Sequence, residues 1–212
     1  MNFSDIRDSV DKIHHLCSEM VGNWLFDLVK QTSNDSIICE VGAFHGYITS
    51  ILGHACLGSN RKVLSVDHMI GGQCDFAEGT KCIYLEYVDN LKPVWSHIIP
   101  FPMKSKEAFK MIKLMNPKIE LLYLDADHNE ENVLYELFYY DKLISIGGVI
   151  CGDDCLPKDK PNSFNTMWEK GDIEEFYSQG VSQVVWGFFN RNPRFEVLPD
   201  VPGNQFGFRK VA

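Results

Sequence analysis

One stretch of sequence decides the fold, and it reads IICEVGAFHGYIT from Ile37 to Thr49. Its apolar run carries an acidic residue, Glu40, near its end, and two glycines, Gly42 and Gly46, follow four positions apart. Glycine lets the backbone approach a ligand closely, and a helix N-terminus presents unpaired N–H groups. The stretch therefore predicts a buried strand, a ligand-binding loop and the start of a helix. The alternative interpretation is a tight turn that binds nothing.

Four further apolar runs follow this strand, separated by amphipathic segments of roughly ten to fifteen residues. Each run suits one buried strand, and the four are Val63–Val66, His97–Phe101, Leu121–Leu124 and Gly148–Cys151. Val181–Asn190 then has a helical pattern, and two strand-like runs, Phe195–Leu198 and Gln205–Lys210, flank a turn-rich segment. The pattern predicts an α/β fold with a mostly parallel seven-stranded sheet, helices on both faces and an antiparallel edge strand.

The segment before Ile37 predicts a long amphipathic helix that begins at Ser4 as its N-cap and continues to Leu28. Its apolar stripe is wider than one partner helix covers, so Ile6–Leu28 predicts a homodimer. We expect a single domain over residues 1–212. It comprises a helical extension (1–34), a cofactor-binding core (35–155), an insertion or lid (156–180) and a C-terminal helix with closing strands (181–212).

The composition excludes several classes of partner. A net charge of -9 and a pI near 5.2 disfavour a nucleic-acid substrate. No apolar run approaches the roughly 20 residues that span a bilayer, so no membrane partner is expected. The seven cysteines are odd in number and lack C-x-x-C spacing, which favours reduced thiols and a cytoplasmic protein.

Two further candidate sites follow the second and third strands. Asp67 ends the second run, and a carboxylate at that position can accept hydrogen bonds from a ribose diol; His68 is its neighbour. A solvated loop residue is the alternative interpretation of Asp67. After the third run, Ser105 is either the N-cap of the next helix or, with Met103, a contact to a ligand.

The strongest local sequence signal is a group of acidic residues that follows the fourth and fifth predicted strands. Asp125, Asp127 and His128 follow the fourth strand, and Asp153 and Asp154 follow the fifth. The ends of parallel strands meet at one edge of a sheet, so four carboxylates and an imidazole are expected to converge there. Gathered carboxylates need hydrogen bonds, protons or a cation, and oxygen ligands suit Mg²⁺ best, with Ca²⁺ or Mn²⁺ as alternatives.

These motifs resemble those of the class I S-adenosylmethionine-dependent methyltransferases, which have a Rossmann-like fold. The glycine loop is similar to their motif I, E-x-G-x-x-x-G. The pattern D-x-D-H, G-G and D-D resembles the metal-dependent O-methyltransferases of the catechol and macrolide-sugar types, and a related family of uncharacterised small-molecule methyltransferases. The resemblance covers residues 37–155.

The resemblance implies a role for each matching residue. The cofactor-binding residues are expected to be Glu40, Gly42, Phe44, Gly46, Asp67, His68, Met103, Ser105 and Asp125. The metal ligands would be Asp125, Asp153 and Asp154. Asp127 matches the base of the sugar type, and His128 falls where the catechol type has a basic residue, so either is the expected catalytic base.

The function predicted from this resemblance is divalent-metal-dependent O-methylation of a small molecule. A metal or a base is needed, because a hydroxyl is a poor nucleophile at neutral pH. The loop 156–170 carries no recognisable substrate signature. Two alternatives stay open: a Rossmann enzyme of another class with a nucleotide cofactor, and a non-catalytic module that binds S-adenosylmethionine.

Overall fold

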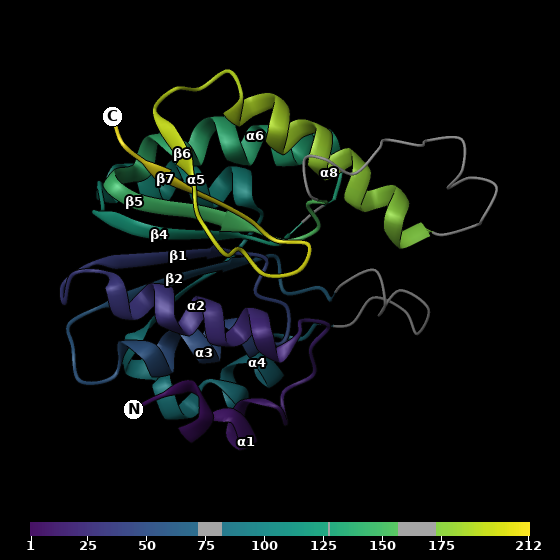
Figure 1. Cartoon of the computed structure of the whole chain (residues 1–212). Helices are drawn as coiled ribbons and strands as arrows, with labels where there is room; N and C mark the ends of the chain where they lie inside the picture. Colours follow the sequence, from purple (N-terminus) through teal and green to yellow (C-terminus); the bar gives the residue numbers. More distant parts are fainter. Residues whose placement is uncertain (72–81, 127, 157–172) are drawn as a thin grey trace.

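The computed structural model describes residues 1–71, 82–126, 128–156 and 173–212 (Figure 1). Seven strands of this part form one sheet in the order β3-β2-β1-β4-β5-β7-β6. The first five strands are parallel, and β7 is antiparallel to both of its neighbours. The strands are β1 (Ile37–Val41), β2 (Lys62–Asp67), β3 (Ile98–Pro102), β4 (Ile119–Leu124), β5 (Ile144–Gly152), β6 (Phe195–Val197) and β7 (Phe206–Lys210). The predicted fold class is confirmed, with the antiparallel strand lying one position inside the edge.

Helices cover both faces of the sheet (Figure 1). One face carries α2 (Glu19–Gln31), α3 (Tyr47–Cys56) and α4 (Tyr84–Asn90), and the other carries α5 (Ser105–Met115), α6 (Glu130–Tyr140) and α8 (Ile173–Phe189). Successive strand residues point to opposite faces, so Ile38 belongs to the core under the first group of helices and Cys39 to the core under the second. The helix α8 begins within the segment predicted as an insertion or lid.

The N-terminal segment is not the one long helix that the periodicity predicts. It forms a 3-10 helix (η1, Phe3–Asp5), a short helix α1 (Arg7–Val10) and the helix α2. Residues 11–18 connect α1 to α2. The N-cap of the first turn is Asn2 rather than the predicted Ser4. The periodicity breaks down because tertiary contacts override it: the ring of His15 stacks on Tyr47 at 3.8 Å.

Much of the apolar stripe that predicts a homodimer is covered by the same chain, although Met20 within it is 59% exposed. Ile6, Val10, Val21 and Leu25 are all at most 4% exposed without any partner subunit. The apolar surface that Ile6–Leu28 offers to a second subunit is therefore smaller than the sequence predicts. The homodimer stays a prediction.

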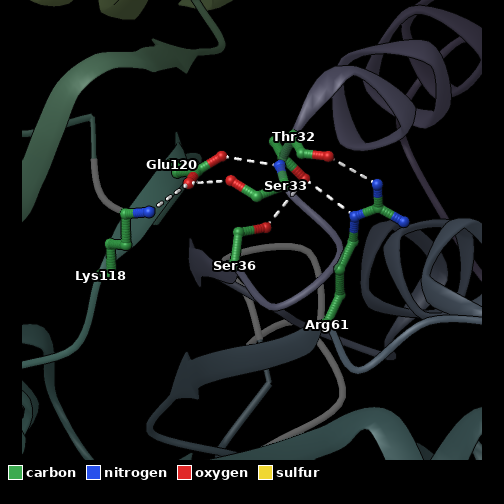
Figure 2. A network of polar contacts seen from close by, with 6 residues as sticks. All are labelled: Thr32, Ser33, Ser36, Arg61, Lys118 and Glu120. Carbon is green, nitrogen blue, oxygen red and sulfur yellow. Dashed lines mark hydrogen bonds and ion pairs between the residues drawn. The ribbon is translucent and has the colours of Figure 1, made fainter.

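A network of polar contacts fastens the end of α2 to the sheet (Figure 2). The backbone N–H of Ser33 donates to the Glu120 carboxylate at 2.8 Å, and the Ser33 hydroxyl donates to its other oxygen. On the opposite side, the Arg61 guanidinium donates to Thr32 through Nε at 3.0 Å and Nη2 at 2.6 Å. Burial opposes ionisation of Glu120, but the bonds from Ser33 and the ammonium of Lys118 together outweigh it and lower the pKa of Glu120.

Candidate active site

The ends of the parallel strands are joined side by side at one edge of the sheet. The backbone amides of Gly42, Asp125 and Asp153 each donate to a carbonyl at the end of the neighbouring strand, at 2.8, 2.8 and 3.1 Å. This continues the ladder beyond the strands and places the glycine loop beside both acidic segments. The convergence expected from parallel topology is present in the backbone.

The glycine loop requires its glycines. Gly42 has φ +99°, and a Cβ at this position would lie 1.9 Å from the carbonyl oxygen of Asp125. Gly46 is the N-cap of α3 with φ +88°, a left-handed conformation that favours glycine. Phe44 also has a positive φ, 48°, which non-glycine residues rarely adopt. Strained backbone of this kind persists where surrounding contacts fix it, often at ligand-binding sites.

Asp67 fixes this loop to the end of β2. Its two carboxylate oxygens accept hydrogen bonds from the backbone N–H of Phe44 at 2.9 Å and of Met69 at 2.6 Å. Each carboxylate oxygen has a second lone pair, so the same group can still accept bonds from a diol. His68 lies beside it, and its Nδ1 accepts from the Ile70 amide at 3.1 Å. The same Nδ1 lies 3.6 Å from Oδ1 of Asp67.

Glu40 lies buried beneath the loop. Its Oε2 accepts from the hydroxyls of Thr49 at 2.5 Å and Ser65 at 3.1 Å, while Oε1 has no partner among the described residues. Burial raises the pKa of Glu40 to about 8, with the two hydroxyls opposing this shift. A buried acceptor without a partner is costly, and a donor group of a ligand would satisfy it.

The acidic residues lie close enough to influence one another. Burial raises the pKa of Asp125, and the neighbouring charges of Asp153 and Asp154 raise it further. Burial also raises the pKa of Asp153, although the backbone N–H of Asp154, donating at 2.7 Å, opposes this. A small cavity beside α6 is lined by Asp125, His128, Asp153 and the buried Glu136 together with apolar side chains. These three predicted residues therefore share one site.

The structure pairs two residues to which the sequence gives separate roles. Nδ1 of His128, the predicted base, contacts Oδ2 of Asp154, a predicted metal ligand. In the described part of the chain, no three acidic, histidine or cysteine side chains are placed to hold a metal ion together. The three predicted metal ligands, Asp125, Asp153 and Asp154, are therefore not arranged around a common metal position in this structure. Asp127, the other predicted base, lies outside the described residues.

Met103 and Ser105, the predicted cofactor contacts after β3, lie against the apolar core and at the start of α5, respectively. The predicted N-cap role of Ser105 is wrong by one position, because Lys104 has the extended backbone of the cap. The carbonyl oxygen of Ser105 accepts from the Tyr140 hydroxyl at 2.8 Å. A contact of Met103 or Ser105 to a ligand stays a prediction.

Three residues of the acidic edge were not predicted. Tyr123 precedes Asp125 by two positions, so strand alternation alone places both on one face. Gln205 donates from its amide to Asp153, and this contact has no local sequence signal because β7 brings it across the sheet. The thiol of Cys17 lies near Asp125 and Asp153: burial first, and then these charges, raise its pKa to about 12.

The comparisons with known proteins identify the family. A family model described as a methyltransferase domain matches residues 39–155, more than half of the 212-residue chain. A search of the curated proteins found no match.

Solved structures share the fold at low sequence identity. An O-methyltransferase from Bacillus cereus in complex with S-adenosylhomocysteine (SAH) is 17% identical, with 99% of this chain and 89% of that one covered at a TM-score of 0.66. The O-methyltransferase TomG from Streptomyces achromogenes, in complex with S-adenosylmethionine (SAM), is 15% identical; 99% of this chain and 89% of TomG are covered, at a TM-score of 0.62. A Clostridium thermocellum protein provisionally described as an rRNA methylase is 13% identical; 92% of this chain and 100% of that one are covered, at a TM-score of 0.59. With its glycine loop, its sheet order and the match to the family model, the chain belongs to the class I SAM-dependent methyltransferases, with their Rossmann-like fold.

Proposed function

We propose that the protein transfers a methyl group from SAM to a hydroxyl oxygen of a small molecule. The observation that carries this proposal is the convergence of Asp125, Asp153 and His128 on one cavity, at the edge of the sheet that also carries the glycine loop. Carboxylates and an imidazole suit the removal of a hydroxyl proton. The acceptor oxygen forms a bond to the methyl carbon, the carbon–sulfur bond breaks, and its electron pair neutralises the sulfonium.

The residues of the loop fit the cofactor. The unpartnered Oε1 of Glu40 and the lone pairs left on Asp67 are acceptors for the ammonium and ribose hydroxyls of SAM. Gly42 and Gly46 leave room for close backbone approach, and Phe44 holds the loop through its N–H to Asp67. His68, Met103, Ser105 and Asp125 complete the proposed set at the ends of the strands.

His128 is the proposed base, and Asp154 is the residue that orients it. A carboxylate on Nδ1 fixes the tautomer of the ring and stabilises the imidazolium that forms when Nε2 takes a proton. Asp127 is the second proposal for the base. The remaining contribution to the rate is in-line positioning, since methyl transfer from a sulfonium needs little else.

The proposal also includes a divalent cation at the acidic edge of the sheet. Asp125 and Asp153 fit it, because burial and then acidic neighbours raise the pKa of both groups, a conflict that a cation resolves. Asp154 would be the third ligand, although it faces His128 here. When bound, Mg²⁺ lowers the pKa of an acceptor hydroxyl; Ca²⁺ and Mn²⁺ are the alternative ions.

Other features support a small acceptor. The net charge of -9 disfavours RNA, the substrate class named for the Clostridium protein.

Among the helices of the described residues, none combines the length and apolar character needed to cross a bilayer. Six cysteines that the structure describes are free thiols, which supports the proposed cytoplasmic location. The homodimer remains part of the proposal, tested by sedimentation.

One experiment separates these possibilities. Thermal unfolding is measured with SAH, NAD, and SAH plus Mg²⁺, because only a true ligand raises the midpoint. We expect SAH to raise it, NAD to leave it unchanged and Mg²⁺ to add to the effect of SAH. A rise with NAD alone favours another Rossmann enzyme class. Radiolabelled methyl transfer to a panel of hydroxyl compounds then distinguishes an enzyme from a binding module, and its loss on chelation tests the cation.

A further inference from the structure

The turn before β7 supplies an amide to the acidic edge. The strand pairing sets Gly152 opposite Phe206, so the residues next to them, Asp153 and Gln205, meet across the two strands. Gln205 is 8% exposed, and its Nε2 donates to Oδ1 of Asp153. Its backbone N–H donates to the carbonyl of Pro202 at 3.1 Å, which fixes the turn. A buried side chain on a fixed turn holds its partner in one position.

The other end of the amide is also occupied. The Tyr123 hydroxyl lies 3.3 Å from Oε1 of Gln205 and 3.3 Å from Oδ2 of Asp125. A carboxylate only accepts hydrogen bonds, so the amide nitrogen must face Asp153 and the amide oxygen must face Tyr123. The single hydroxyl hydrogen of Tyr123 then has two acceptors, and it links the two carboxylates through Gln205.

We propose that Gln205 is a positioning residue that holds the Asp153 carboxylate toward a divalent cation, and that Tyr123 acts through Gln205. This inference rests on the proposed function, since it treats Asp153 as a ligand. A group that orients a ligand carboxylate commonly changes metal affinity by about 10- to 100-fold when it is removed. Gln205 touches neither the cofactor nor the acceptor in this scheme, so its loss leaves cofactor binding intact.

The test is calorimetric titration of Mn²⁺ into the whole chain saturated with SAH, together with a separate titration of SAH. The variants are Gln205→Leu, Tyr123→Phe and the double variant, with Gln183→Leu on the exposed face of α8 as the matched control. We expect Gln205→Leu to weaken Mn²⁺ binding about 10- to 100-fold with SAH affinity unchanged, and the control to match the wild type. Gln205→Asn, which keeps the amide but is one carbon shorter, should lose Mn²⁺ affinity too, and it replaces Gln205→Leu if that variant does not fold.

The double variant tests the role of Tyr123. If Tyr123 acts through Gln205, Tyr123→Phe has no further effect once Gln205 is replaced; additive losses would instead show a direct action on Asp125 and overturn that part. Wild-type Mn²⁺ affinity in Gln205→Leu and Gln205→Asn would overturn the positioning role. If the wild-type protein binds SAH but does not bind Mn²⁺, both the proposed cation and this inference are refuted. If it does not bind SAH, the proposed function itself is refuted.

Discussion

Gly42 lies against Asp125 so closely that any side chain at position 42 would collide with the Asp125 carbonyl, because a Cβ there comes within 1.9 Å of that oxygen. The contact joins the glycine loop to the acidic edge of the sheet. The Asp125 amide also donates to the end of β1 at 2.8 Å. A change in the loop is therefore transmitted to the carboxylate site through backbone rather than through side chains.

The first prediction concerns this contact. Gly42→Ala should destabilise the fold by about 1–3 kcal/mol, since it adds both a clash and a side chain at positive φ, and should also abolish SAH binding. Urea unfolding and calorimetry measure the two effects. The control is Gly187→Ala in α8, where an added Cβ meets nothing within 4 Å; it should be neutral or stabilise by about 0.5–1 kcal/mol. Equal stability of the two variants would contradict the argument.

The second prediction concerns Asp67. Asp67→Ala removes the acceptor that fixes the Phe44 amide and the acceptor proposed for the ribose, so SAH binding should weaken by about 1.5–3 kcal/mol. Asp67→Asn keeps one acceptor oxygen and should lose less. Asp89→Ala, which removes an exposed ion pair with Lys92, serves as the control. Unchanged calorimetric affinity in Asp67→Ala would remove this residue from the site.

The third prediction is a pH dependence due to Glu40. Its pKa is raised to about 8 in the folded state, against 4.5 as its ordinary value. The unfolded chain therefore releases the proton at lower pH than the folded chain, and the free energy of unfolding falls as pH rises from about 4.5 to about 8. Glu40→Gln does not titrate, so its stability relative to the wild type should increase across this range. Urea unfolding at several pH values, without ligand, checks this, and a constant difference would contradict it.

The fourth prediction has the opposite sign and concerns Glu120. Its pKa is lowered in the folded state: burial opposes the shift, and the bonds from Ser33 together with the Lys118 ammonium outweigh burial. Its stabilising contribution is present above the ordinary pKa of 4.5 and is lost as pH falls through the lowered value. Ser33→Ala should cost about 0.5–1.5 kcal/mol at pH 7 and progressively less in acid. Ser96→Ala, at an exposed position, should show no such trend in the same denaturation series.

Sequence reasoning located the strand ends well, because apolar runs and the residues that follow them are local features. Gly42, Asp67, Asp125 and Asp153 all lie at the carboxyl edge where the pattern placed them. What they contact was not predictable, since the Asp67 bonds to loop amides depend on the turn geometry after each strand.

The failures share a physical cause, which is contact between segments distant in sequence. The predicted N-terminal helix breaks where His14 and His15 lie against the aromatic rings of Phe44 and Tyr47. The contact of Gln205 with Asp153 depends on the insertion of β7 between β5 and β6. Neither contact leaves a periodic trace in the sequence, so tertiary structure alone reveals it.

The position of β7 also bears on how the molecule assembles. Asp153 and Gln205 are 52 residues apart in the chain, so their contact carries an entropic cost of loop closure that grows only slowly with the length of the loop. A partly folded chain with only the five parallel strands in place would expose its acidic residues to water without the amide that faces them. The amide of Gln205 therefore faces the acidic edge only when β7 is paired with β5.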